Sequence, residues 1–80
     1  MSDATKPGKL ALPVWHTPEG EAVSCLEKIK VLNENLEELR DMAQEALEDA
    51  VLMGCDEAQF RRVMQDLAAG LVNPYRKDKR

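Results

Sequence analysis

Three side chains of this sequence could bind a metal or undergo redox chemistry: His16, Cys25 and Cys55. None lies at the spacing of known metal motifs, such as two cysteines separated by two residues. The cysteines flank a predicted helix of about 29 residues, so they lie about 44 Å apart at 1.5 Å per residue. A disulfide within the chain is therefore excluded. We expect a solvent-facing histidine and two packed thiols, with no metal or cofactor. The alternative is a metal or redox carrier in which the three residues meet between chains.

Catalysis has little support in the sequence. Ser24 could be assembled with His16 and an acid into a nucleophilic triad, but Ser24 and Glu27 have the spacing of a capping box at the start of a helix. The sequence lacks a glycine-rich phosphate loop, and 80 residues are too few to enclose a substrate pocket of typical size. We therefore predict that the protein is not an enzyme and that it has no catalytic residues.

Acidic residues dominate the middle of the chain. Residues 19–59 contain twelve acids and three bases, whereas residues 60–80 contain six bases and two acids. The acidic part repels phosphate, so we expect no nucleic-acid partner. Most of these acids fall outside the apolar positions of the predicted helix, which indicates a solvated face rather than a carboxylate metal site. The basic residues 76–80 are predicted to form a disordered, solvated tail.

One long helix, at about residues 25–53, is predicted from the spacing of apolar and small side chains. These residues alternate at intervals of four and three, which is typical of a helix that packs lengthwise along another helix. The first half of this seam is made of Ile and Leu and the second half of Ala, so the two halves are suited to different neighbours. The seam consists of Cys25, Ile29, Leu32, Leu36, Leu39, Ala43, Ala46, Ala50 and Met53.

A second, shorter helix is predicted at about residues 57–72. Gly54 ends the first helix, Asp56 and Gln59 form a capping box, and Pro74 prevents continuation. The short connection makes the two helices antiparallel.

This antiparallel arrangement predicts specific partners across the hairpin. It places Ala50 opposite Phe60, a small side chain facing a large one. It also places Asp49 opposite Arg61, which suggests an ion pair between the helices.

The residues before the first helix are predicted to form an arm. Residues 1–9 are polar and expected to be disordered, and residues 10–23 alternate between apolar residues and helix breakers. Thr17-Pro18-Glu19-Gly20 fits a β-turn, and the sequence leaves open whether the arm closes into a small β-hairpin. The predicted fold is all-α: an uneven antiparallel helical hairpin with an extended N-terminal arm, forming one domain at residues 10–75.

The second helix is too short to cover the first half of the first helix. Either the arm folds back over the uncovered leucines, or a second chain covers them. We predict a homodimer with a four-helix arrangement, and the sequence does not choose between a parallel and an antiparallel dimer. The expected dimer or partner interface consists of Val14, Trp15, Cys25, Leu26, Ile29, Leu32 and Leu36.

These expectations favour a small cytoplasmic module that binds another protein or regulates it. No segment approaches the roughly 20 apolar residues of a membrane span, and the start of the chain does not resemble a signal peptide. Besides the metal or redox carrier, the remaining alternative is a small accessory subunit of a larger enzyme. The sequence does not identify the protein partner or the biological process.

Overall fold

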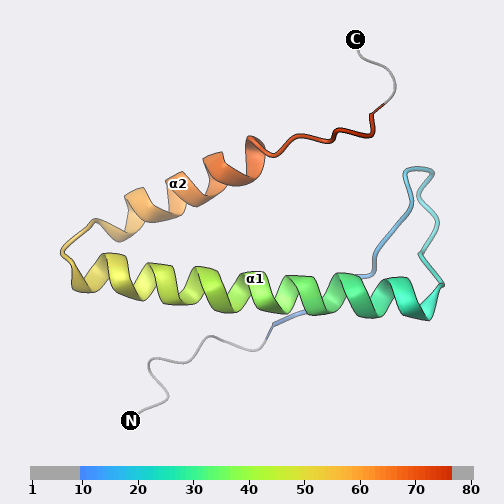
Figure 1. Ribbon diagram of the computed structural model, residues 1–80, viewed down its shortest axis with the longest axis horizontal. Coiled ribbons are helices and arrows are strands. Elements are labelled where there is room, and N and C mark those ends of the chain that lie inside the picture. Colours follow the sequence, from blue (N-terminus) through green and yellow to red (C-terminus); the bar gives the residue numbers. More distant parts are fainter. Residues whose placement is uncertain (1–9, 77–80) are drawn as a thin grey trace. The chain divides into compact units, whose positions relative to one another are not determined.

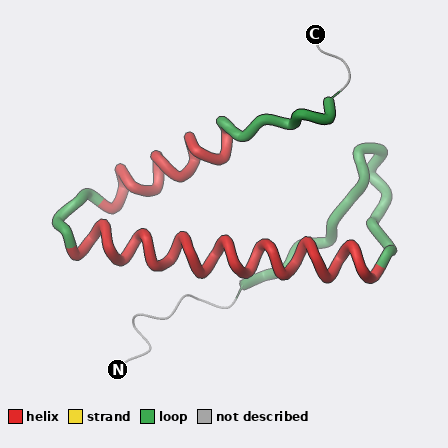
Figure 2. Tube along the Cα trace, viewed as in Figure 1, coloured by secondary structure: helices red, strands yellow, loops and turns green. Residues whose placement is uncertain are grey.

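The protein is an all-α chain, as predicted (Figures 1 and 2). The computed structural model describes residues 10–76, which contain the helices α1 (Leu26–Leu52) and α2 (Glu57–Ala69) and no β-strand. α1 begins and ends one residue inside the bounds that we predicted. The chain divides into two compact units, Met1–Ala46 and Leu47–Arg80, which are described separately below.

The start of α1 differs from the predicted capping box. The amide of Ile29 donates to the carbonyl of Cys25 at 3.0 Å, so Cys25 occupies the N-cap position. The helix therefore begins one residue later than a box formed by Ser24 and Glu27 requires. No hydrogen bond joins these two residues in the part of the chain that the structure describes, and the predicted box is wrong.

The end of α1 is a Schellman motif built on Gly54, as its sequence position predicted. Gly54 has a φ of +89°, a region that favours glycine. Its amide donates to Val51 at 3.0 Å, and the amide of Cys55 donates to Ala50 at 2.8 Å. These two bonds satisfy carbonyls that the helix end would otherwise leave unpaired. They turn the chain directly into the cap of α2.

α2 begins as predicted and ends earlier than predicted. The carboxylate of Asp56 accepts a hydrogen bond from the Gln59 amide at 2.9 Å, which confirms Asp56 as the N-cap. The helix ends at Ala69 instead of near residue 72, because Gly70 acts as its C-cap. The Gly70 amide donates to Asp66 at 2.9 Å and to Leu67 at 3.2 Å. Glycine is a weak helix former, so the helix ends there and does not continue toward Pro74.

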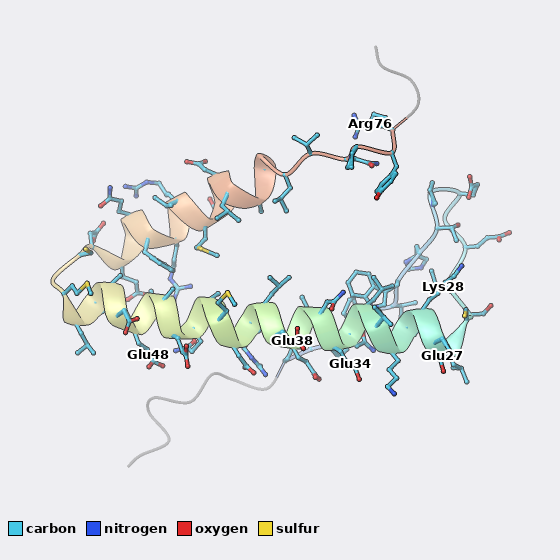
Figure 3. The ribbon with its side chains drawn as sticks, viewed as in Figure 1. Glu27, Lys28, Glu34, Glu38, Glu48 and Arg76 are labelled. Carbon is cyan, nitrogen blue, oxygen red and sulfur yellow. The ribbon has the colours of Figure 1, made fainter. Side chains whose placement is uncertain are left out.

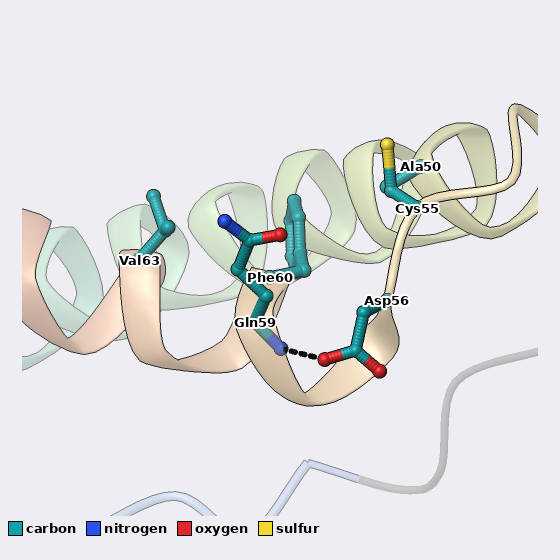
Figure 4. A pocket seen from close by; sticks show the side chains of 6 residues that line it. All are labelled: Ala50, Cys55, Asp56, Gln59, Phe60 and Val63. Atoms are coloured by element: carbon teal, nitrogen blue, oxygen red, sulfur yellow. Dashed lines mark hydrogen bonds between the residues drawn. The ribbon is translucent and has the colours of Figure 1, made fainter.

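Within the second unit, the last turn of α1, the connecting turn and α2 form a helical hairpin. Ala50 and Phe60 line a common hollow of about 160 Å³, in agreement with their predicted pairing (Figure 4). The predicted ion pair between Asp49 and Arg61 is wrong. Arg61 instead binds Glu57 at 2.9 Å, one turn earlier on α2. A pair at this spacing lies on one helix face and does not depend on the neighbouring helix.

The arm in the first unit contains the predicted turn. The Gly20 amide donates to the carbonyl of Thr17 at 2.9 Å, and Gly20 has a φ of +93°. The Thr17 amide donates to Glu21 at 2.8 Å, which completes a three-residue hairpin loop of the kind that ends in a left-handed glycine. One isolated antiparallel bridge, between His16 and Ala22, follows. The arm thus closes into a hairpin turn without forming strands.

No side chain among residues 10–76 is fully buried. The most covered residues are only half-buried, and many large apolar side chains are mostly exposed. Within the same residues, neither helix combines the length and the apolar content needed to cross a membrane.

The Schellman turn provides a test of the hairpin. A Gly54→Ala substitution forces an alanine into a left-handed conformation and should lower the free energy of unfolding by about 1–2 kcal/mol. Gly70→Ala is the matched control, since Gly70 has a φ of −85° and room for a methyl group. That control should leave stability unchanged or slightly raised. Thermal unfolding followed by circular dichroism compares the two variants, and equal melting temperatures would contradict the role of Gly54.

Candidate interaction surface

The first unit is held together by a contact between the arm and α1. The indole Nε1–H of Trp15 donates to Asn33 Oδ1 at 2.8 Å, and both residues are half-buried. A tryptophan contributes a large apolar ring and one N–H group, which needs an acceptor when water is excluded. Asn33 supplies this acceptor from the middle of the leucine half of α1. The bond therefore fixes where the arm lies on the helix.

The helix face around Asn33 is the face that the sequence predicted to be uncovered. Ile29 precedes Asn33 by one helical turn, Leu32 is its neighbour, and Leu36 follows by three residues; all three are half-buried. The contact through Trp15 places the arm on this face. The chain thus covers part of its own leucine stripe, which was one of the two arrangements that the sequence left open.

The predicted interface residues fall into two groups in the structure. Trp15 lies with the face that carries Ile29, Leu32 and Leu36, and these four side chains are half-buried. The remaining three are open to solvent: Val14 is 69% exposed, Leu26 is 79% exposed and Cys25 is classed as exposed. The exposed residues lie before the Trp15 contact in the arm and at the start of α1.

A further group of exposed apolar side chains lies on α1, and it includes Leu39, which the sequence analysis placed in the seam. Val31, Leu39 and Met42 are 52%, 63% and 70% exposed, although all three are large and apolar. Their spacing of eight and three residues places them on one side of the helix. We call these three residues the outer row. The spacing of the outer row is also present in the sequence. The seam that includes Leu39 is a more continuous pattern, so the outer row is harder to recognise from the sequence alone.

A surface hollow lies beside the start of the outer row. It measures about 410 Å³ and is lined by Glu27, Lys28, Val31 and Leu32. Its lining is mostly apolar, and a charged side chain of each sign is present. The hollow could receive a large apolar side chain with a polar group at its edge.

Four glutamates follow one side of α1 next to the outer row. Their intervals of seven, four and seven residues keep them in line on a helix. All four are exposed, and none has an ion-pair or hydrogen-bond partner for its side chain within residues 10–76. Figure 3 labels three of them along α1. We call this set the acidic row: Glu27, Glu34, Glu38 and Glu45.

The cysteines do not have the packed environment that we expected. Cys25 and Cys55 are both free and exposed, because one is the N-cap residue of α1 and the other lies in the turn after it. His16 is exposed, in agreement with the sequence analysis. Among the described residues, no group of three or more His, Cys, Asp or Glu side chains is arranged to hold a metal ion.

The contact between Trp15 and Asn33 can be tested by intrinsic fluorescence, since Trp15 is the single tryptophan of the chain. Asn33→Ala removes the acceptor and should weaken the attachment of the arm by about 1 kcal/mol. The emission maximum should move to longer wavelength, and acrylamide should quench the fluorescence more strongly. Asn35→Ala is the matched control, because Asn35 is exposed and does not contact Trp15. Identical spectra for both variants would show that the bond does not hold the arm.

No protein-family model, curated protein or solved structure matches this chain. Its candidate function therefore depends on its own surfaces. These are a leucine stripe that the arm partly covers, and an outer row bordered by glutamates without partners.

Proposed function

We propose that this protein is a small cytoplasmic module that binds other proteins, or regulates them, through the apolar side chains of α1. The observation that supports this function is the exposure of apolar side chains. Fourteen large hydrophobic residues are exposed among residues 10–76, and none is fully buried. Single exposed apolar residues are normal, but a row of them on one helix is typical of an association surface.

The small size of the chain strengthens the proposal. Complete burial of a large aliphatic side chain contributes about 1.5–3 kcal/mol, and a short chain has few sources of stability to replace it. In this protein that contribution is only partly realised, because the covered residues of α1 are half-buried. Association with another chain would bury the remaining area.

The first partner that we propose is a second copy of this chain. The half-buried Ile29, Leu32 and Leu36 would pack against the same residues of the partner, with Val14 and Trp15 closing one edge. Such a contact has two-fold symmetry, so each residue acts twice in the interface. The exposed Leu26 and Cys25 would extend the contact toward the start of α1.

Substitution of Leu32 tests the homodimer. Leu32→Glu places a carboxylate in both halves of the proposed interface and should give a monomer with much lower stability, by about 3 kcal/mol or more per dimer. Glu38→Lys changes an exposed position outside the leucine stripe and should change the association little. Sedimentation velocity at low and high micromolar concentration measures the effect.

Two results of this experiment would contradict the dimer. An unmodified protein that remains monomeric at high micromolar concentration would show that the arm alone covers the stripe. A Leu32→Glu variant that associates as strongly as the unmodified protein would place the contact elsewhere. Affinity purification of the tagged chain from its native cell then separates a free regulator from an accessory subunit of a larger enzyme.

A further inference from the structure

We propose that the outer row and the acidic row of α1 together form a docking surface for a basic amphipathic helix of another protein. This inference rests on the proposed function as an interaction module, and it names the chemistry of the partner. The surface borders the stripe proposed for the homodimer, and Leu32 lines both that stripe and the hollow beside Val31. Its apolar part consists of Val31, Leu39 and Met42, and its charged part consists of the four glutamates defined above.

The outer row has the form of a helix-binding face. Val31 and Met42 are eleven residues apart, a spacing of almost exactly three turns, and Leu39 lies between them on the same side. Their exposed fractions of 52%, 70% and 63% show that the arm of the same unit does not cover them. Methionine is flexible and polarisable, which suits a surface that adapts to a partner side chain.

The glutamates border the outer row at neighbouring helix positions. Glu27 precedes Val31 by four residues and Glu34 follows it by three. Residues three or four apart are adjacent on a helix surface, so both carboxylates lie beside this valine.

Two further glutamates lie beside Met42 in the same way, eleven residues further along the helix. Glu38 precedes Met42 by four residues and Glu45 follows it by three. From Glu27 to Glu45 the acidic row extends about 27 Å at 1.5 Å per residue, the length of five helical turns. The outer row from Val31 to Met42 spans about 17 Å of this length at 1.5 Å per residue. An apolar row with one negative border matches a helix with an apolar stripe and lysines or arginines beside it.

Charge complementarity favours such a partner over a second copy of this chain. In an antiparallel pair formed through the outer row, the two acidic rows would face each other, because equivalent flanks meet in that arrangement. In a parallel pair the acidic row would meet the opposite flank, where Leu32, Leu36 and Ala43 are apolar and Lys28 is the single base. Neither arrangement gives more than one of the four glutamates a positive partner. A basic helix would give each of the four glutamates a positive partner.

Apolar contact and charge have different roles in this surface. Exposed ion pairs contribute only about 0–1 kcal/mol each, so the outer row and the hollow beside Val31 supply most of the binding free energy. The shallow hollow beside Val31, with Glu27 among its lining residues, gives an apolar side chain of the partner a surface to pack against. The acidic row selects for positive charge, speeds encounter and excludes acidic helices.

The test uses designed peptides and the full-length protein. The first peptide is a helix with leucines on one stripe and lysines along its border. The second replaces every lysine with glutamate, and the third has the composition of the first in an order that destroys helical periodicity. Isothermal titration calorimetry should show binding of the lysine helix at least about tenfold tighter than binding of either other peptide. The affinity should fall several-fold when the salt concentration is raised, because exposed charges are screened.

Two pairs of variants locate the binding site. Met42→Gln should weaken binding of the lysine helix about fivefold or more, as expected for an exposed apolar contact worth about 1 kcal/mol. Its control, Leu52→Gln, changes a side chain that is 85% exposed in the other unit and should have no effect. The double variant Glu34→Gln with Glu38→Gln should reduce both the affinity and its dependence on salt. Glu37→Gln, on a different side of the helix, should change neither. Circular dichroism confirms that each variant retains its helix content.

Three outcomes would overturn the proposal. Equal binding of the lysine and glutamate helices would remove the charge argument, and binding unaffected by Met42→Gln would place the site elsewhere. Loss of self-association in the Met42→Gln variant would show that a second copy occupies the outer row. These outcomes remain distinguishable from the homodimer test, because that test measures the association state of the unmodified protein, whereas this one measures peptide binding. A protein that fails to dimerise but binds the lysine helix would contradict the homodimer and support the second surface.

Discussion

A single long helix with more apolar surface than the chain can cover is the constraint that governs this structure. α1 has 27 residues and α2 has 13, so the second helix has half the length needed to accompany the first. Fully buried side chains are absent from the described part of the chain as a result. The remaining elements are best understood by how much of the apolar surface each one covers.

The arm covers part of the apolar surface of α1 through one tryptophan. An extended segment forms few contacts with a helix, but the Trp15 ring adds a large apolar area, and its bond to Asn33 fixes the position of that area. Backbone hydrogen bonds in the turn at Thr17–Gly20 then return the chain to the start of α1. Because the cover depends on few contacts, another chain could replace or extend it at modest energetic cost.

Charge separates the faces of α1 more clearly than hydrophobicity does. Leucine stripe and outer row are both apolar, but only the outer row is bordered by a line of glutamates without partners. Two arginines bind acids on their own helix: Arg40 binds Asp41 at 2.7 Å, and Arg61 binds Glu57. The acidic row thus has no positive partner among the described residues.

The sequence by itself determined the all-α fold, the two helices, the turn at Gly54 and the cap at Asp56, because glycine conformation, side-chain caps and apolar spacing act within a few residues. Some local details were still misjudged. The capping residue of α1 shifted from Ser24 to Cys25, and Gly70 ended α2 before residue 72. Only the tertiary structure decided that the arm lies on α1, that Asn33 accepts the Trp15 bond, and that the cysteines are exposed. Trp15 and Asn33, which form the contact between the arm and α1, are 18 positions apart in the sequence. At such a separation the arm could contact any of several faces of the helix. The spacing of residues in a sequence does not predict which helix face the arm contacts. That choice depends on the shape and hydrogen bonding of the surfaces that meet.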